Sequence, residues 1–251
     1  MKSLLLALQF LTIIPVKVSL AREDELAKSM ICFPLIGLLL GLALVGIDNL
    51  FLNLNFPEFS INIILVISLV ILTGGMHLDG LADTADALLS RKSKEEMLTI
   101  MRDPHIGVMG VLAIISMLLL KSSFLSTLGI SSKMTALLLM CILSRWSMVF
   151  TIFLFPYARE EGKAKTFTQG ITLKIFILAT IITLIPVIAI WRIKGLLVLM
   201  IIAGVNYIFG KAMDKKIGGI TGDTLGAAEE ITEVIILFSI CILERGNLWI
   251  I

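Results

Sequence analysis

Charged side chains are scarce in this sequence. Only 16% of its 251 residues are Asp, Glu, Lys or Arg, whereas soluble domains have about a quarter. This scarcity excludes a water-soluble globular domain as a description of the whole chain. The net charge is also small, at +2, which excludes the strongly basic surface expected of a nucleic-acid-binding protein. The basic residues are better explained by membrane topology.

Cysteine is sparse as well. The three cysteines, Cys32, Cys141 and Cys241, stand alone in or beside apolar runs, and no Cys-x-x-Cys spacing occurs. This pattern excludes a disulfide framework and a cysteine zinc site, and we interpret the three thiols as small buried apolar residues. The sequence also lacks internal repeats, low-complexity tracts and the alternating strands of a membrane barrel.

Apolar residues are abundant instead. They make up 58% of the chain, and the mean hydropathy is +1.02. Several runs reach the length of about 20 residues that a helix needs to cross a bilayer. Because backbone groups in lipid must bond internally, these continuous runs predict helices. We expect an all-α, polytopic transmembrane helix bundle in which residues 1–251 form a single integral membrane catalytic domain.

The apolar runs predict about seven spans and a short N-terminal helix. Residues 4–14 are too few for a span, and no signal-peptide cleavage pattern follows them, so we expect an interfacial or re-entrant helix there. The short run at 195–212 and the polar motif after 60–77 leave counts of six and eight open. The predicted spans are 30–53, 60–77, 107–128, 134–156, 171–191, 195–212 and 231–250.

Lysine and arginine lie mostly on one side of these spans. Because cytoplasmic loops hold the excess of basic residues, the loops 17–29, 77–106, 157–170 and 211–230 are predicted to face the cytoplasm. The same loops hold most of the acidic residues and glycine clusters. We therefore expect a multi-pass protein of the cytoplasmic (inner) membrane with its active face toward the cytoplasm. Only Lys121, Lys133, Arg192, Lys194 and Arg245 are assigned to the other side.

The densest polar motif covers residues 73–88. On a helix, Asp79, Asp83 and Asp86 stand at i, i+4 and i+7, which places three carboxylates on one stripe. Such oxygen ligands suit Mg²⁺ shared with substrate phosphates. A solvated helix stripe is the alternative, but the opposite face is apolar, and carboxylates at membrane depth favour function. His77 nearby is either a structural hydrogen-bonding group or a ligand or acid.

A second acidic motif covers residues 218–233, at the start of the last span. Thr221 or Asp223 is suited to cap the helix, and the glycines leave backbone N–H groups accessible to a phosphate. Asp223 and Glu230 are seven residues apart, so a second carboxylate face is predicted. The alternative is an ordinary capped helix with acids that complement its dipole. That alternative does not account for the glycines.

Three further residues lie between these motifs. Asp103 stands at the entrance to the third span. Arg145 lies inside the fourth span, a costly position unless a carboxylate or an anion faces it. Arg145 and Arg159 together are suited to grip phosphate oxygens, although a structural pair of Arg145 with one of the aspartates is an equal alternative. For Arg159 the positive-inside rule alone is nearly sufficient.

These features favour phosphoryl transfer, which needs positioning and charge neutralisation more than covalent chemistry. No activated Ser or Cys is evident, Mg²⁺ would bridge phosphates, and either a carboxylate or His77 would take the proton of an attacking hydroxyl. The predicted catalytic residues are His77, Asp79, Asp83, Asp103 and Arg145; the substrate-binding residues are Arg159, Gly219, Thr221, Gly222 and Asp223; the metal ligands are Asp79, Asp83, Asp86, Asp223 and Glu230.

The chain resembles cobalamin synthase, the adenosylcobinamide-GDP ribazoletransferase family, nearly from end to end. The most specific matches are the His-Asp motif at 74–86 and the Thr-Gly-Asp motif at 218–227; segments 10–16, 33–37, 101–107 and 144–146 support them. Two positions depart from the pattern. Ile13 stands where arginine is expected, so the N-terminal segment is given no catalytic role, and Ala87 stands where glycine is common.

The resemblance implies a membrane enzyme of late vitamin B12 assembly. It would join adenosylcobinamide-GDP to α-ribazole or its 5′-phosphate and release GMP, with Mg²⁺ as cofactor. The ribazole 3′-hydroxyl would attack the phosphate on the cobinamide arm. Membrane lipid is an expected partner and nucleic acid is not, while a homo-oligomer or a complex with other corrinoid-assembly enzymes stays open.

Three other classes of protein share some of these features. A CDP-alcohol phosphotransferase also sets aspartates around Asp-Gly near a membrane surface, but the rest of its motif is missing here. A prenyltransferase has two aspartate-rich motifs, whereas the second motif here is rich in Gly and Glu. An ion-coupled secondary transporter would place acids among helices, but it tends to have repeated halves.

Overall fold

The computed structural model describes residues 2–16, 18 and 22–245, and all regular elements in this part of the chain are helices. The predicted all-α class is thereby confirmed. Lys17 and residues 246–250 of the last predicted span lie outside the described residues. The helices are α1 (Lys2–Leu11), α2 (Glu23–Ser29), the 3-10 turn η1 (Met30–Cys32), α3 (Phe33–Asn53), α4 (Glu58–Thr73), α5 (Met76–Leu89), α6 (Lys94–Ile100), α7 (Val108–Ser126), α8 (Ile130–Leu154), α9 (Lys163–Gly170), α10 (Leu173–Ile217) and α11 (Gly222–Arg245).

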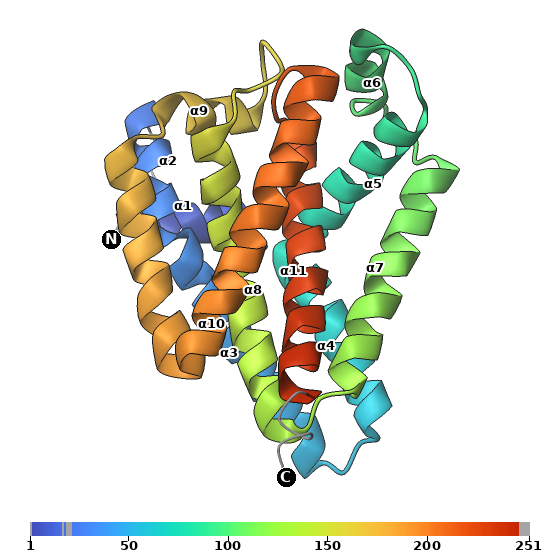
Figure 1. Ribbon diagram of the computed structural model, residues 1–251, viewed down its shortest axis with the longest axis vertical. Coiled ribbons are helices and arrows are strands. Elements are labelled where there is room, and N and C mark those ends of the chain that lie inside the picture. The colour runs from blue at the N-terminus through green and yellow to red at the C-terminus, as the bar shows by residue number, and fades with distance from the viewer. Residues whose placement is uncertain (1, 17, 19–21, 246–251) are drawn as a thin grey trace.

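The helices run back and forth between two ends of the bundle (Figure 1). One end carries α2, α6, α9 and the turn between α10 and α11, while short turns join α3 to α4 and α7 to α8 at the other end. Within the described residues, four helical stretches are long and apolar enough to cross a membrane, or five if the bent pair α4–α5 counts as one span. The bundle is that of a membrane protein, and the count of seven spans stays a prediction.

The span predicted at 60–77 is broken by two glycines. Helix α4 ends at Gly74 and α5 begins after Gly75, with φ angles of 66° and 69°. This left-handed backbone suits glycine, which has no Cβ. The two helices meet at 91°. Helix α5 therefore runs across the bundle and carries its aspartates away from the axis of α4.

Helix α10 corresponds to two predicted spans. Its backbone departs from helical geometry at Trp191 and Arg192, and the chain reverses there, so that the two arms lie side by side (Figure 1). Gly195 permits this contact, because a Cβ at that position would lie 2.8 Å from the Val187 carbonyl oxygen. The boundary predicted between spans 171–191 and 195–212 falls at this turn.

Helix α8 is the central helix of the bundle. In its most apolar stretch 83% of the residues are buried, against 17% in α7. Helix α3 packs on α8 through Gly37 and Gly41, where an added Cβ would collide with the α8 backbone at Cys141 and Leu138. Glycines four residues apart allow such close helix contact in membranes.

Large apolar side chains cover the outside of α7 and α10. Leu112, Leu119, Ile185, Met200 and Ile208 are all exposed. Without water at membrane depth, such side chains face lipid at no cost in hydrophobic free energy. The outer helices are therefore suited to the hydrocarbon core of a bilayer.

Two lysines assigned from the sequence to the non-cytoplasmic side are buried within helices. Lys121 and Lys133 are 2% and 1% exposed and belong to α7 and α8. Each is paired with carboxylates, Lys133 with Asp48 at 2.9 Å. Buried carboxylates thus compensate each lysine for the solvation that it loses on leaving water, and the side of the membrane assigned to the two lysines stays a prediction.

Candidate active site

Helices α5 and α11 cross at two glycines. A Cβ on Gly80 would lie 2.7 Å from the carbonyl oxygen of Asp223, and one on Gly226 would lie 3.0 Å from the carbonyl oxygen of His77. Glycine at both positions lets the two backbones touch. The crossing brings the two polar motifs of the sequence together, although they are far apart along the chain.

The turn before α11 is held by the loop after α8. The Ala158 N–H donates to the Ile220 carbonyl at 2.8 Å, and the Ile220 N–H donates to the Pro156 carbonyl at 2.8 Å. Gly219 makes room for this pairing with its φ of 140°. As a result, Arg159 Nη2 lies 2.7 Å from Asp223 Oδ2.

Thr221 is the N-terminal cap of α11. Its hydroxyl accepts from the Thr224 N–H at 3.1 Å, and its own N–H donates to the Thr224 hydroxyl at 2.8 Å. This reciprocal pair satisfies donors that the first turn would leave free. Thr221 is fully buried, so the structure assigns it to holding the turn, while Gly222 beside it is exposed.

Three cavities lie at this end of the bundle, and the Arg159–Asp223 pair lines one of them. An apolar cavity of about 270 Å³ lies among α1, α5, α8 and α11, and an aspartate cavity of about 260 Å³ lies between α5 and the loop before α7. A polar groove of about 480 Å³ separates α6 from the loop after α8. Asp79 lines the first two cavities, Arg102 the aspartate cavity and the groove, and Arg159 the groove and the apolar cavity.

Asp79 and Asp83 are the unpaired carboxylates of this site. Asp79 is exposed and Asp83 half-buried, and neither accepts a hydrogen bond or an ion pair from any side chain that the structure describes. With Asp223 they concentrate negative charge around the two cavities, which only Arg159 offsets by direct contact. Free carboxylate oxygens fit the hard-ligand preference of Mg²⁺.

Asp86 has a different environment. Its two oxygens accept hydrogen bonds from the N–H groups of Gly107 at 2.7 Å and Gly110 at 2.9 Å, which satisfies free donors at the start of α7. Side chains at 107 or 110 would collide with the carboxylate. We therefore leave Asp86 out of the proposed metal-binding set.

Asp103 stands at the rim of the aspartate cavity. It accepts from the His105 N–H at 3.0 Å and contacts the His105 ring at 2.7 Å. These contacts hold the pKa of the Asp103 carboxyl below its usual range. Asp103 is thus a carboxylate at neutral pH, on the same cavity as Asp79 and Asp83.

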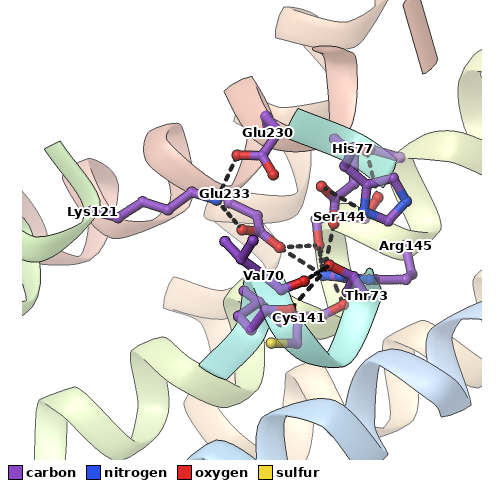
Figure 2. Close-up of polar contacts among 12 residues, drawn as sticks. Val70, Thr73, His77, Lys121, Cys141, Ser144, Arg145, Glu230 and Glu233 are labelled. Carbon is purple, nitrogen blue, oxygen red and sulfur yellow. Dashed lines mark hydrogen bonds and ion pairs between the residues drawn. The ribbon is translucent and has the colours of Figure 1, made fainter. Parts of the chain in front are cut away.

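Arg145 belongs to a buried charge network (Figure 2). Its Nη1 lies 2.7 Å from Glu229 and 2.6 Å from Glu233, while Lys121 contacts Glu230 at 2.7 Å and Glu233 at 2.5 Å. The predicted structural pair of Arg145 is present, but its partners are glutamates and not aspartates. Arg145 is 0% exposed, and a buried cation needs such partners.

Glu230 is tied to this network. Its carboxylate lies close to those of Glu229 and Glu233, in a grouping suited to a metal ion by geometry alone. However, Lys121 and Arg145 already occupy the middle of the three acids. The donor set therefore does not call for a further cation, and we leave Glu230 out of the proposed metal-binding set as well.

His77 links the network to the apolar cavity. Its Nδ1 lies 3.3 Å from Glu229, the ring is buried, and its Nε2 has no hydrogen-bond partner among the described residues. Residue 77 also lines the apolar cavity with Asp79 and Asp223. Its predicted catalytic role stays a prediction.

The structure thus gathers most of the residues predicted from the sequence. His77, Asp79, Arg159, Gly222 and Asp223 share one cavity, and Asp83 and Asp103 adjoin it. Arg145, Glu230 and Asp86 are engaged elsewhere, and Gly219 and Thr221 shape the turn. Sequence reasoning missed Lys121, Glu229 and Arg102, although a lysine within an apolar run was a usable signal for Lys121.

This fold and site define a polytopic membrane protein with a polar, carboxylate-rich candidate site at one end of its helices. The family model for cobalamin-5-phosphate synthase matches residues 3–241, and the chain belongs to that family. Its relatives include the adenosylcobinamide-GDP ribazoletransferases of Desulforamulus reducens and Roseiflexus sp., which are 36% and 40% identical over 95% and 92% of this chain and 95% and 86% of their own length.

A third relative of the same name, from Caldanaerobacter subterraneus, is 39% identical over 96% of this chain and 98% of its own length. These similarities confirm the family suggested by the two motifs and favour it over the rival classes. No solved structure matches the chain.

Proposed function

We propose that this chain joins adenosylcobinamide-GDP to α-ribazole, or to its 5′-phosphate, and releases GMP. Relatives bearing the name of this activity span nearly the whole chain. The structural observation that carries the proposal is the meeting of Asp79, Asp223 and Arg159 on one cavity. A phosphoryl-type displacement needs negative and positive groups around one reacting phosphate, with little covalent chemistry from the protein.

We further propose that Asp79, Asp83 and Asp223 hold Mg²⁺. These carboxylates come from α5 and α11, and two of them have no protein partner among the described residues. A bound Mg²⁺ would neutralise charge on the diphosphate and on the departing GMP. The arrangement of the residues supports one such site at the crossing of the two helices.

The remaining residues position the substrates. Arg159 presents two or more N–H donors to phosphate oxygens while it contacts Asp223. The turn at Gly219–Gly222 and the capped start of α11 place the Asp223 carboxylate beside the cavity. The buried network of Arg145 keeps α5, α7, α8 and α11 in register beneath the site.

The site end of the bundle faces the cytoplasm in this proposal, and the membrane is the cytoplasmic membrane. The basic residues of the loops around α6 and α9 support this orientation through the positive-inside rule. Water-soluble nucleotide substrates would then reach the site directly. This orientation is compatible both with a homo-oligomer and with a complex of the chain with other corrinoid-assembly enzymes.

The test is a reconstituted reaction. Purified protein in detergent or nanodiscs receives adenosylcobinamide-GDP, α-ribazole and Mg²⁺, and GMP release is followed by chromatography. We expect one GMP for each corrinoid product, and no release when either substrate is omitted. GMP formation that does not depend on ribazole, or no turnover with either form of ribazole, would contradict the proposal.

A further inference from the structure

The two cavities that Arg159 lines differ in chemistry. The wall of the apolar cavity is mostly apolar and partly aromatic, and it includes Phe10, Met76, Met148, Tyr157 and Leu225. The polar groove has Glu95, Thr99, Glu160 and Glu161 beside its two arginines. Since Arg159 lines both the apolar cavity and the polar groove, each of the two is suited to a different part of the substrates.

We propose that the apolar cavity binds the benzimidazole base of ribazole and that the polar groove binds the guanosine of the leaving nucleotide. This inference rests on the proposed function and adds a division of the site into a nucleophile side and a leaving-group side. Arg159 stands at the boundary of the two hollows, where the phosphate that is transferred must lie.

The apolar cavity fits an aromatic nucleophile. Ligand sites are mostly apolar with a few placed polar groups, and here Asp79, Asp223 and Arg159 are those groups. A flat benzimidazole packs well against aromatic and methionine side chains. With the base in this cavity, a ribose hydroxyl reaches the carboxylates at its wall.

The polar groove fits a guanosine phosphate. Guanine carries N–H donors along one edge, and carboxylates accept from such donors. Glu95, Glu160 and Glu161 are all exposed to the groove, while Arg102 and Arg159 offer donors to the phosphate. The Arg159 side chain is only 10% exposed, and its Nε has no hydrogen-bond partner among the described residues.

This division suits the displacement itself. The ribazole oxygen forms a bond to the phosphorus on the cobinamide arm, and the bond from that phosphorus to the oxygen of GMP breaks. The hydroxyl proton passes to a carboxylate or to His77 at the wall of the apolar cavity. Attacking and departing oxygens lie roughly in line in such a transfer. Because the apolar cavity and the polar groove share only Arg159, the attacking ribazole and the departing GMP lie on different sides of the phosphorus.

The test compares a variant of the apolar cavity with a control variant outside it. Ala164→Phe, with residue 164 on the apolar cavity, should raise the KM for α-ribazole at least tenfold and leave the KM for adenosylcobinamide-GDP within twofold. Ala189→Phe is the matched control, because Ala189 is exposed on α10 away from the site. Should Ala164→Phe fail to fold, Ala164→Leu should raise the KM for α-ribazole by a smaller factor.

The groove is probed with GMP and IMP as product inhibitors, since IMP lacks the guanine amino group. In the native protein GMP should inhibit more strongly than IMP, and at least one of Glu95→Gln, Glu160→Gln and Glu161→Gln should reduce that preference about tenfold, the size of a lost charged hydrogen bond. Glu58→Gln, at the first residue of α4, should leave it unchanged, because α4 begins at the end of the bundle opposite α6 (Figure 1).

The outcomes separate the two proposals. An active enzyme in which Ala164→Phe raises the KM for adenosylcobinamide-GDP and not for ribazole would overturn the division of the site, as would an unchanged GMP preference in all three glutamine variants. A native protein that releases no GMP would instead overturn the proposed function itself.

Discussion

Arg159 and Asp223 form an ion pair of 2.7 Å between the loop after α8 and the first turn of α11. The pair exists because two main-chain hydrogen bonds join these loops at Ala158 and Ile220. Arg159 therefore has two functions to separate. It neutralises Asp223, and in the proposed function it also presents its remaining donors to the substrate phosphate.

Changing Arg159 distinguishes these functions. Arg159→Ala should lower kcat/KM about 100-fold, close to 3 kcal/mol of transition-state stabilisation. Arg159→Lys should restore only part of it, because lysine keeps the charge but loses the planar set of donors. Steady-state kinetics give the values. Full activity in Arg159→Lys would show that neutralising Asp223 is the only function of the arginine.

The three carboxylates of the proposed metal site should each be indispensable. Asp79→Asn, Asp83→Asn and Asp223→Asn should lower turnover by at least about 100-fold, because even residues that only support a metal ligand cost 10- to 100-fold. The matched control is Asp214→Asn, an exposed carboxylate near the end of α10. Near-normal rates in the three variants, with normal elution from a sizing column, would refute the metal assignment.

Asp86 should act on stability and not directly on chemistry. Asp86→Ala leaves the start of α7 without its acceptor, and the loss of such a cap costs about 1–2 kcal/mol. Gly110→Ala should destabilise similarly, since a Cβ there would lie 2.5 Å from the carboxylate. Thermal unfolding in detergent measures both changes. If Asp86→Ala lowers turnover without changing the unfolding temperature, Asp86 would belong to the metal site after all.

The buried network should respond to the loss of one partner more than to the loss of two. Lys121→Met leaves Glu230 buried without its cation, which we expect to destabilise the protein by about 3–5 kcal/mol. Lys121→Met combined with Glu230→Met should recover part of that loss, because no unpaired charge remains on residue 230. Equal destabilisation in the single and double variants would argue against an ion pair at this position.

Orientation is tested by labelling. Ser93 caps α6 and is exposed at the site end of the bundle. In a background without Cys32, Cys141 and Cys241, a Ser93→Cys variant in intact cells should resist a membrane-impermeant thiol reagent and react after the membrane is opened. Labelling of intact cells would place the site on the outer face.

The sequence was informative wherever a pattern is local. Runs of apolar residues located the helices, and the reversal at Arg192 fell between two predicted spans because a basic pair interrupts the run there. The aspartate spacing on α5 was also readable. The partners of Arg145 were not, since glutamates one turn apart on α11 and aspartates on α5 are equally plausible from spacing alone.

Other features depend on contacts between distant segments. Asp86 fits a metal stripe by its spacing, but its oxygens bond to α7 because glycines at 107 and 110 let the helices approach. Lys121 was counted from the sequence as a charge on the non-cytoplasmic side, although it falls inside the predicted span 107–128. Only the packing of α7 on α11 shows that Glu230 and Glu233 pair with it.

The central claim is that oxygens from α5 and α11 meet at a single ion. The most direct measurement is Mn²⁺ binding to the purified protein, followed by electron paramagnetic resonance, with Mn²⁺ in place of Mg²⁺. We expect saturable binding that is lost in both Asp79→Asn and Asp223→Asn and retained in Asp214→Asn. Binding that survives either of the first two changes unaltered would contradict a site shared by the two helices.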